Sequence, residues 1–253
     1  AVSIPVVAAA AVLLLGFVLE RHAPTLLLPV FAALTACGLL AMSGFRLPER
    51  PDEAADRPAE HRSIAAVLRS HPRFALTLLG CMFFFLTHTI SNTYMNALVG
   101  KAGGTASAVG TSLAISAVLE LPAMTLVSRL QKRFSPGFFL RFAAGAEVVK
   151  FLIFYLARSM PLIYLGHCMQ FFQFAVYAPA TVYYVAAALP EREQLKGQSL
   201  IYVAGSGLGG ALGNLLGGRL LDRSGIQAAL LLGTVSAAAS LLTFCLSTRK
   251  DSR

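Results

Sequence analysis

Charge is confined to the connections of this 253-residue chain, and that pattern limits its fold more than any other feature. Eight long apolar segments together contain only four of the 21 basic and 12 acidic residues, namely Glu120, Arg141, Glu147 and Lys150. A helix of about 20 mostly apolar residues crosses about 30 Å of hydrocarbon, where charge is costly. We therefore predict an all-α polytopic membrane protein with eight transmembrane helices. They span residues 2–19, 25–45, 74–98, 106–127, 138–157, 160–189, 198–218 and 226–246.

The composition argues against soluble classes of protein. Hydrophobic residues make up 56% and charged residues 13%, against about 25% charged residues in soluble domains. The net charge of +9 does not indicate nucleic acid, because the position of Lys and Arg is what matters in a membrane protein. No metal-binding, nucleotide-binding or catalytic motif has supporting context. We therefore expect no enzyme, no cofactor, no metal and no nucleic-acid partner.

The basic residues are distributed unequally between the two sides of the predicted membrane domain. Fifteen of them lie in alternate connections that would share one side, within residues 46–73, 129–141, 192–196 and 249–253, if Arg141 near the start of its segment is counted with the connection before it. Five lie in the other connections, and Lys150 is left deep inside a segment. Cytoplasmic loops carry the excess of Lys and Arg. This predicts a multi-pass protein of the cytoplasmic (inner) membrane with both termini in the cytoplasm.

A short internal repeat indicates how the helices are grouped. The pattern G-x-x-x-acid-Arg occurs at Gly16–Arg21 and again 202 residues later at Gly218–Arg223. Each copy follows one apolar segment and precedes another, so the first two helices resemble the last two. A parallel repeat of six helices is typical of one large class of transporters.

On that plan the chain looks like an N-terminally truncated copy of a twelve-helix protein. Residues 1–45 would hold the last two helices of the first half, and residues 74–253 the complete second six-helix half. Residues 46–73 would form a cytoplasmic linker with a short amphipathic helix near Ser63–Ser70.

Polar residues recur at helical spacing inside four segments, which places them on shared faces. They either line a water-filled pathway or hydrogen-bond neighbouring helices. The most continuous set comprises His167, Gln170, Gln173, Tyr177, Thr181 and Tyr184. The other sets are Ser112, Ser116 and Glu120; His88, Ser91, Asn92 and Asn96; and Gln198, Tyr202 and Ser206.

The ionisable residues inside the segments are hypotheses for a functional site. Glu147 and Lys150 are three residues apart and can pair on one helix face, for coupling, for substrate binding or for structure alone. Glu120 precedes Leu121-Pro122, which favours a structural role. His88 and His167 could carry protons, because histidine ordinarily titrates near neutrality, although a membrane histidine is more often a hydrogen-bonding residue of the packing.

Four glycines in the segment 198–218 indicate close helix packing. Gly205, Gly209, Gly213 and Gly217 are spaced by four, so a neighbouring helix can approach their shared face. Residues 205–210 also match G-x-G-x-x-G, but they lie inside an apolar segment without the βαβ unit that dinucleotide binding needs.

Several motifs resemble the major facilitator superfamily, and within it the branch of sugar/proton symporters similar to lactose permease and phenylpropionate permease. They are Glu120-Leu-Pro122, Ser128-Arg129-Leu130, Lys132-Arg133-Phe134, Lys196-Gly197-Gln198, and a loop motif with Gly218, Asp222, Arg223 and Gly225. The resemblance covers essentially the whole chain. It implies two six-helix bundles that rock around a central site.

One part of that resemblance departs from the branch. Its symporters use an Arg on the ninth helix with a His and a Glu three apart on the tenth. The same spacing here gives Lys150, Gln170 and Gln173. Because glutamine does not titrate, that proton relay does not carry over.

The sequence therefore predicts a secondary active transporter that moves a small organic solute, such as a sugar, by alternating access and with proton coupling. We expect its partners to be the lipid bilayer, the solute and protons, and the full-length form to be monomeric. A drug or metabolite efflux pump is the alternative, and a membrane receptor without transport is a more distant one. The predicted site comprises Glu147, Lys150, Gln170, Gln173, Tyr177, His167, Asn92, His88 and Glu120.

Overall fold

The computed structural model describes residues 29, 32–33, 35–36 and 63–249. Two of the predicted segments, 2–19 and most of 25–45, lie outside these residues, as do Gly16–Arg21 and residues 46–62. The part of the chain that is described is helical and contains no strand. Its elements are α3 (Ile64–Ser70), α4 (Pro72–Thr93), α5 (Met95–Lys101), α6 (Ala106–Leu130), α7 (Pro136–Leu156), α8 (Met160–Cys168), η3 (Met169–Phe171), α9 (Phe174–Ala188), α10 (Glu191–Tyr202), η4 (Val203–Gly209), α11 (Gly210–Ser224) and α12 (Ile226–Ser247).

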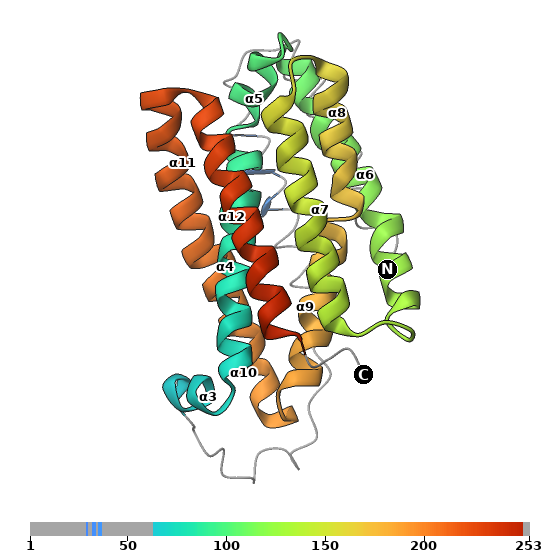
Figure 1. The fold of residues 1–253 in the computed structure, drawn as a ribbon. Coiled ribbons are helices and arrows are strands. Elements are labelled where there is room, and N and C mark those ends of the chain that lie inside the picture. Colours follow the sequence, from blue (N-terminus) through green and yellow to red (C-terminus); the bar gives the residue numbers. More distant parts are fainter. Residues whose placement is uncertain (1–28, 30–31, 34, 37–62, 250–253) are drawn as a thin grey trace.

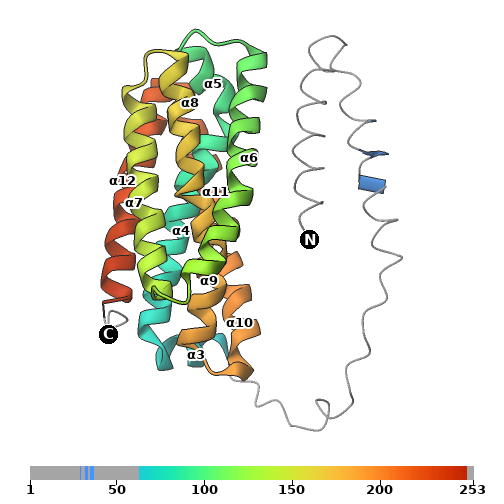
Figure 2. The same ribbon diagram turned by 90° about the vertical axis from the view of Figure 1, so that its right-hand side faces the viewer.

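The long helices run side by side as an elongated bundle (Figures 1 and 2). Helix α12 packs against α4 and α7, and α7 packs in turn against α8 and α9. Helix α6 covers α8, η3 and α9, while η4 and α11 lie along α4. The interior therefore holds residues from helices that are distant in sequence.

Five helices of the described residues are long and apolar enough to cross a membrane. These are Pro72–Thr93, Ala106–Leu130, Met160–Ala188, Glu191–Ser224 and Ile226–Ser247. Helix α7 has 21 residues, which is also a spanning length, but it carries three charged side chains. The prediction of an all-α polytopic membrane protein is confirmed, whereas the count of eight spans stays a prediction.

Helices α4 and α12 are joined by hydrogen bonds as well as by apolar contact. The hydroxyl of Ser240 donates to the carbonyl oxygen of Gly80 at 2.9 Å. The hydroxyl of Thr87 donates to the carbonyl oxygen of Gly233 at 3.3 Å. All four groups are shielded from water, where such bonds have no competing partner. The two helices are therefore joined by buried hydrogen bonds at two positions along their length.

The predicted glycine face packs closely against α4. A Cβ on Gly209 would overlap the carbonyl oxygen of Met82, and one on Gly213 would lie 2.6 Å from the carbonyl oxygen of Leu86. Gly205 and Gly217 face the rings of Phe85 and Tyr94 at similarly short range. The absence of side chains brings the two backbones together, as small residues do in membrane bundles. These short distances agree with the close packing predicted from the spacing of the glycines.

The turn from α11 to α12 explains one residue of the loop motif. Gly225 has φ +75° and ψ 176°, a conformation that side chains rarely allow, and its N–H donates to the carbonyl oxygen of Leu221 at 2.9 Å. Gly218 and Asp222 precede it within α11. Glycine at this position reverses the chain directly into the next long helix.

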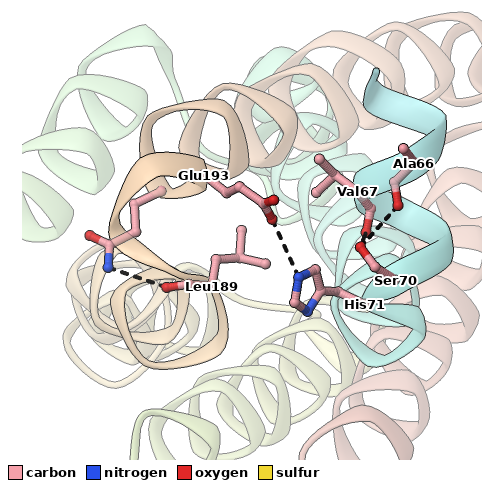
Figure 3. Close-up of polar contacts among 7 residues, drawn as sticks. Ala66, Val67, Ser70, His71, Leu189 and Glu193 are labelled. Carbon is pink, nitrogen blue, oxygen red and sulfur yellow. Dashed lines mark hydrogen bonds and ion pairs between the residues drawn. The ribbon is translucent and has the colours of Figure 1, made fainter. Parts of the chain in front are cut away.

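At the opposite end of the bundle, α3 contacts α10 through a histidine and a glutamate. Ser63 caps α3, which matches the short helix predicted near Ser63–Ser70. Nε2 of His71 lies 3.3 Å from Oε2 of Glu193 (Figure 3). Ser70 donates to the carbonyl oxygens of Ala66 and Val67 within α3. The contact holds α3 beside the start of α10.

A lysine binds the end of α7. Nζ of Lys101 donates to the carbonyl oxygen of Tyr155 and to Oε1 of Gln227, each at 3.0 Å. We expect Lys101→Met to lower the free energy of unfolding by about 1 kcal/mol, because a cation that bonds the last carbonyls of a helix stabilises it. The unfolding midpoint of purified protein in detergent measures this. Lys132→Met, at an exposed position, is the control, and equal midpoints for the two variants would contradict the prediction.

Candidate functional site

Ionisable and amide side chains meet inside the bundle, near the middle of the long helices. Helix α7 contributes Glu147 and Lys150, and the neighbouring α6 contributes Glu120. The remaining members come from the end of α8 and from the residues between α8 and α9. The site is therefore assembled from several helices. We define the polar cluster as Glu120, Glu147, Lys150, His167, Gln170 and Gln173.

A hydrogen-bonded chain links three elements across this cluster. Nζ of Lys150 donates to Oε1 of Gln170 at 2.9 Å. Nε2 of Gln170 donates to Oε1 of Glu120 at 2.8 Å. Lys150 and Gln170 are almost completely buried, and Glu120 is partly buried. The amide therefore bridges an ammonium and a carboxylate, which compensates charges that would be costly if each were alone.

The predicted pair between Glu147 and Lys150 is not formed. Glu147 is 0% exposed, and among the described residues neither of its carboxyl oxygens has a hydrogen-bond partner. The ammonium of Lys150 instead bonds Gln170 and lies 5.8 Å from the ring centroid of Phe154. The ammonium of Lys150 therefore bonds an acceptor on another element, Oε1 of Gln170, and not the carboxyl of Glu147 on its own helix. The structure therefore corrects the expected local pair.

The helix over residues 160–189 is interrupted at the cluster. Helix α8 ends at Cys168, a 3₁₀ turn follows over Met169–Phe171, and α9 begins at Phe174. Gln173 has φ −99° and ψ −93°, outside the helical region. Transporters commonly place binding groups at such breaks, where side chains and backbone can face a cavity. Gln170 and Gln173 both lie in this interruption between α8 and α9.

The interruption was not predicted, because the apolar pattern continues through it. Gly166 lies before the break and Pro179 well after it. The break itself contains no residue that ends a helix on sequence grounds. The paired glutamines are the one signal that could have pointed to it.

The two histidines each have a polar contact with a residue on another element, and His88 has a second one within α4. Nδ1 of His167 lies 3.1 Å from Oγ of Ser116 on α6, while its Nε2 is buried without a partner among the described residues. Nε2 of His88 lies 3.0 Å from Nδ2 of Asn92. Nδ1 of His88 lies 3.5 Å from Nε2 of Gln173, so α4 reaches the edge of the polar cluster. The contact between Ser116 and His167 was not foreseen, although both residues were singled out.

The predicted stripe on residues 160–189 is buried along its whole length, which agrees with its spacing. Tyr177 stacks on Phe84 with ring centroids 3.9 Å apart. The hydroxyl of Thr77 donates to the Tyr184 hydroxyl at 2.9 Å. Its members Gln170, His167 and Tyr184 therefore bond neighbouring helices in this conformation. That the stripe lines a pathway stays a prediction.

Other predicted positions lie away from the polar cluster. Asn92 and Asn96 are exposed on α4 and α5, and Asn92 touches the cluster only through His88. Tyr202 and Ser206 are exposed on the outer face of α10 and η4. The described residues hold no group of three His, Cys, Asp or Glu side chains placed for a metal ion.

Comparison with known proteins places this bundle in a family. Residues 1–232 match the MFS_1 like family. The maltose permease of Geobacillus stearothermophilus is 27% identical over 245 residues, which cover 96% of this chain and 61% of the permease. The uncharacterized transporter YwbF of Bacillus subtilis (strain 168) is 22% identical over 211 residues, covering 83% of this chain and 53% of that protein. The chain thus spans just over half the length of these relatives, and it belongs to the MFS_1 like family of major facilitator superfamily transporters.

Proposed function

We propose that the protein is a secondary active transporter that moves a small hydroxylated solute, such as a sugar, together with protons. The family supports transport, and the name of the maltose permease supports a sugar as the solute. We further propose that it acts by alternating access as a monomer in the cytoplasmic membrane, with both termini in the cytoplasm. The unequal distribution of basic residues supports that orientation.

The hydrogen-bonded chain from Lys150 through Gln170 to Glu120 is the observation that carries this proposal. It offers an ammonium, an amide and a carboxylate at a helix break inside the bundle. A solute with several hydroxyl groups can replace each of these contacts by donating to the carboxylate and accepting from the ammonium or the amide. Gln173, with an amide oxygen that has no partner among the described residues, adds a further acceptor.

Solute flux tests the proposal. The protein is expressed from its complete gene, purified and reconstituted into proteoliposomes. Uptake of labelled maltose, glucose, lactose and phenylpropionate is then followed with and without an inward proton gradient. We expect concentrative uptake of at least one sugar, driven by the gradient and accompanied by alkalinisation outside the vesicles.

The other outcomes would contradict the proposal in distinguishable ways. Extrusion of hydrophobic drugs without sugar uptake would establish the efflux pump instead. No flux of any compound, together with ligand-dependent binding of a partner protein, would support the receptor. Sugar uptake that ignores the proton gradient would retain transport and refute symport.

A further inference from the structure

We infer that a cavity at one end of the bundle binds the phosphate group of a phosphate monoester. The cavity lies where α4 and α7 begin and where α9 and α12 end, and its volume is about 500 Å³. The inference goes beyond the proposed function, because it requires neither the solute nor the proton of transport. It rests on the charges and the hydrogen-bond donors that line this cavity.

The cavity is separate from the polar cluster. No residue of that cluster lines it. On α7 it reaches Pro136, whereas the first cluster residue of that helix is Glu147, eleven residues and about 17 Å further along. In the orientation proposed above, this end of the bundle faces the cytoplasm, where phosphorylated metabolites are found.

The lining of the cavity carries positive charge without negative charge. Arg73 and His71 belong to it, and the described residues that form it include no Asp or Glu. The guanidinium of Arg73 is exposed and has no hydrogen-bond or ion-pair partner in the described part of the chain. A guanidinium presents five N–H donors in a planar fork that fits phosphate oxygens. The cavity therefore selects an anion over a neutral or cationic ligand.

Two further residues of the lining have donor capacity to spare. Nε2 of His71 is engaged by Oε2 of Glu193 at 3.3 Å, while Nδ1 has no partner among the described residues (Figure 3). In the imidazolium form both ring nitrogens donate. The hydroxyl oxygen of Ser135 accepts from the N–H of Phe138 at 3.3 Å, and its own proton has no acceptor within residues 63–249. The three residues therefore offer donors to the three terminal oxygens of one phosphate.

The rest of the lining is suited to an organic group. It includes the rings of Pro72, Phe74 and Pro136 and the small side chains of Ala187 and Ala188. A cavity of about 500 Å³ is within the range of small-molecule sites and exceeds the size of an inorganic phosphate ion. The cavity therefore fits a monoester, in which a dianionic phosphate is attached to one organic group. A soluble metabolite and the headgroup of phosphatidic acid share this chemistry.

Hydrogen bonds between helices hold the walls of the cavity in place. Nη1 of Arg141 donates to the carbonyl oxygen and to the hydroxyl oxygen of Thr248, each at 3.2 Å, which ties the end of α12 to α7. The hydroxyl of Thr77 on α4 donates to the hydroxyl of Tyr184 on α9 at 2.9 Å. The site is therefore formed before the ligand arrives, and binding loses little free energy to rearrangement.

Ligand-dependent stability tests the inference without a measurement of transport. The protein is expressed from its complete gene and purified in detergent. Its unfolding midpoint is then measured at constant ionic strength with increasing glycerol 3-phosphate, inorganic phosphate or glycerol. A ligand that binds only the folded protein raises the midpoint. We expect glycerol 3-phosphate to raise it most, inorganic phosphate to raise it less, and millimolar glycerol to leave it unchanged.

Nanodiscs distinguish a soluble ester from a lipid headgroup. Protein in nanodiscs of phosphatidylcholine is compared with protein in nanodiscs that also contain phosphatidic acid. A soluble ligand predicts that glycerol 3-phosphate raises the midpoint equally in both. A headgroup ligand predicts that phosphatidic acid raises the midpoint by itself and that added glycerol 3-phosphate raises it no further. Either result supports a phosphate site and names its source.

Three variants locate the site. Arg73→Gln should weaken the binding of glycerol 3-phosphate at least about tenfold, because hydrogen bonds to a charged group are lost. Its midpoint without ligand should equal that of the wild type, since the guanidinium has no partner to lose. Arg192→Gln removes an exposed arginine of α10 outside the lining and should bind normally. Ala187→Leu keeps every donor but occupies part of the cavity, and it should weaken binding as well.

The results that overturn the inference are independent of solute flux. Wild-type affinity in Arg73→Gln would overturn it, as would the absence of any response to glycerol 3-phosphate and to phosphatidic acid. An equal loss of affinity in Arg73→Gln and Arg192→Gln would show a general effect of charge and no site. Failure to transport any solute would remove the proposed function and leave this inference standing.

Discussion

Replacing Lys150 with methionine will abolish solute transport. Methionine has nearly the same length but no charge, so Oε1 of Gln170 loses its donor and Glu120 loses the cation to which that amide links it. Removing one partner of a buried charged pair costs about 3–5 kcal/mol. If that cost falls on the solute-bound state, affinity decreases by about 100-fold or more. Initial uptake rate and solute affinity in proteoliposomes measure the effect.

The comparison variants separate the site from a general effect of charge. Lys132→Met also removes one positive charge, at an exposed position, and should transport normally. The double variant Lys150→Met with Glu120→Gln should recover the abundance of folded protein, because removing both charges that Gln170 links is less costly than removing one. It should not recover transport. Wild-type uptake by Lys150→Met alone would refute the proposed site.

Replacing Gly209 with alanine will disrupt the packing of η4, at its junction with α11, against α4. The added Cβ would overlap the carbonyl oxygen of Met82, a backbone atom that cannot rotate away. Overpacking of this kind typically costs 1–3 kcal/mol, and we expect about 3 kcal/mol because the obstacle is backbone. The amount of monodisperse protein extracted from membranes and its unfolding midpoint should both fall sharply.

A control for that variant lies two residues away in the same π-helical segment. An added Cβ on Gly207 would have the carbonyl oxygen of Tyr202 as its nearest neighbour, at 3.8 Å, which is an ordinary contact. Gly207→Ala should therefore fold as the wild type does. If the Gly209→Ala and Gly207→Ala proteins were equally abundant and equally stable, the close approach of η4 to α4 would be refuted.

The long helices could be predicted because charge is costly in hydrocarbon, so charged residues are concentrated in the connections between apolar segments. The segment predicted at 226–246 became Ile226–Ser247, and that at 138–157 became Pro136–Leu156. The ends were less predictable. Residues 74–98 divide at Tyr94, where α4 stops and α5 starts. Apolar content does not distinguish one helix from two short ones in line.

The site could be predicted as a set of residues but not as a set of contacts. Spacing along one helix suggested that Lys150 would pair with Glu147, the nearest opposite charge. The actual partner, Gln170, lies twenty residues further along, in the 3₁₀ turn between α8 and α9. A contact that depends on the relative placement of three helices leaves no periodic trace in the sequence.

The hydrogen bonds between α4 and α12 have a mechanical consequence. Ser240 and Thr87 tie the two helices at separate heights, so neither can slide along the other without losing a buried bond. We therefore expect α4 and α12 to move together as one rigid unit in any rearrangement of the bundle.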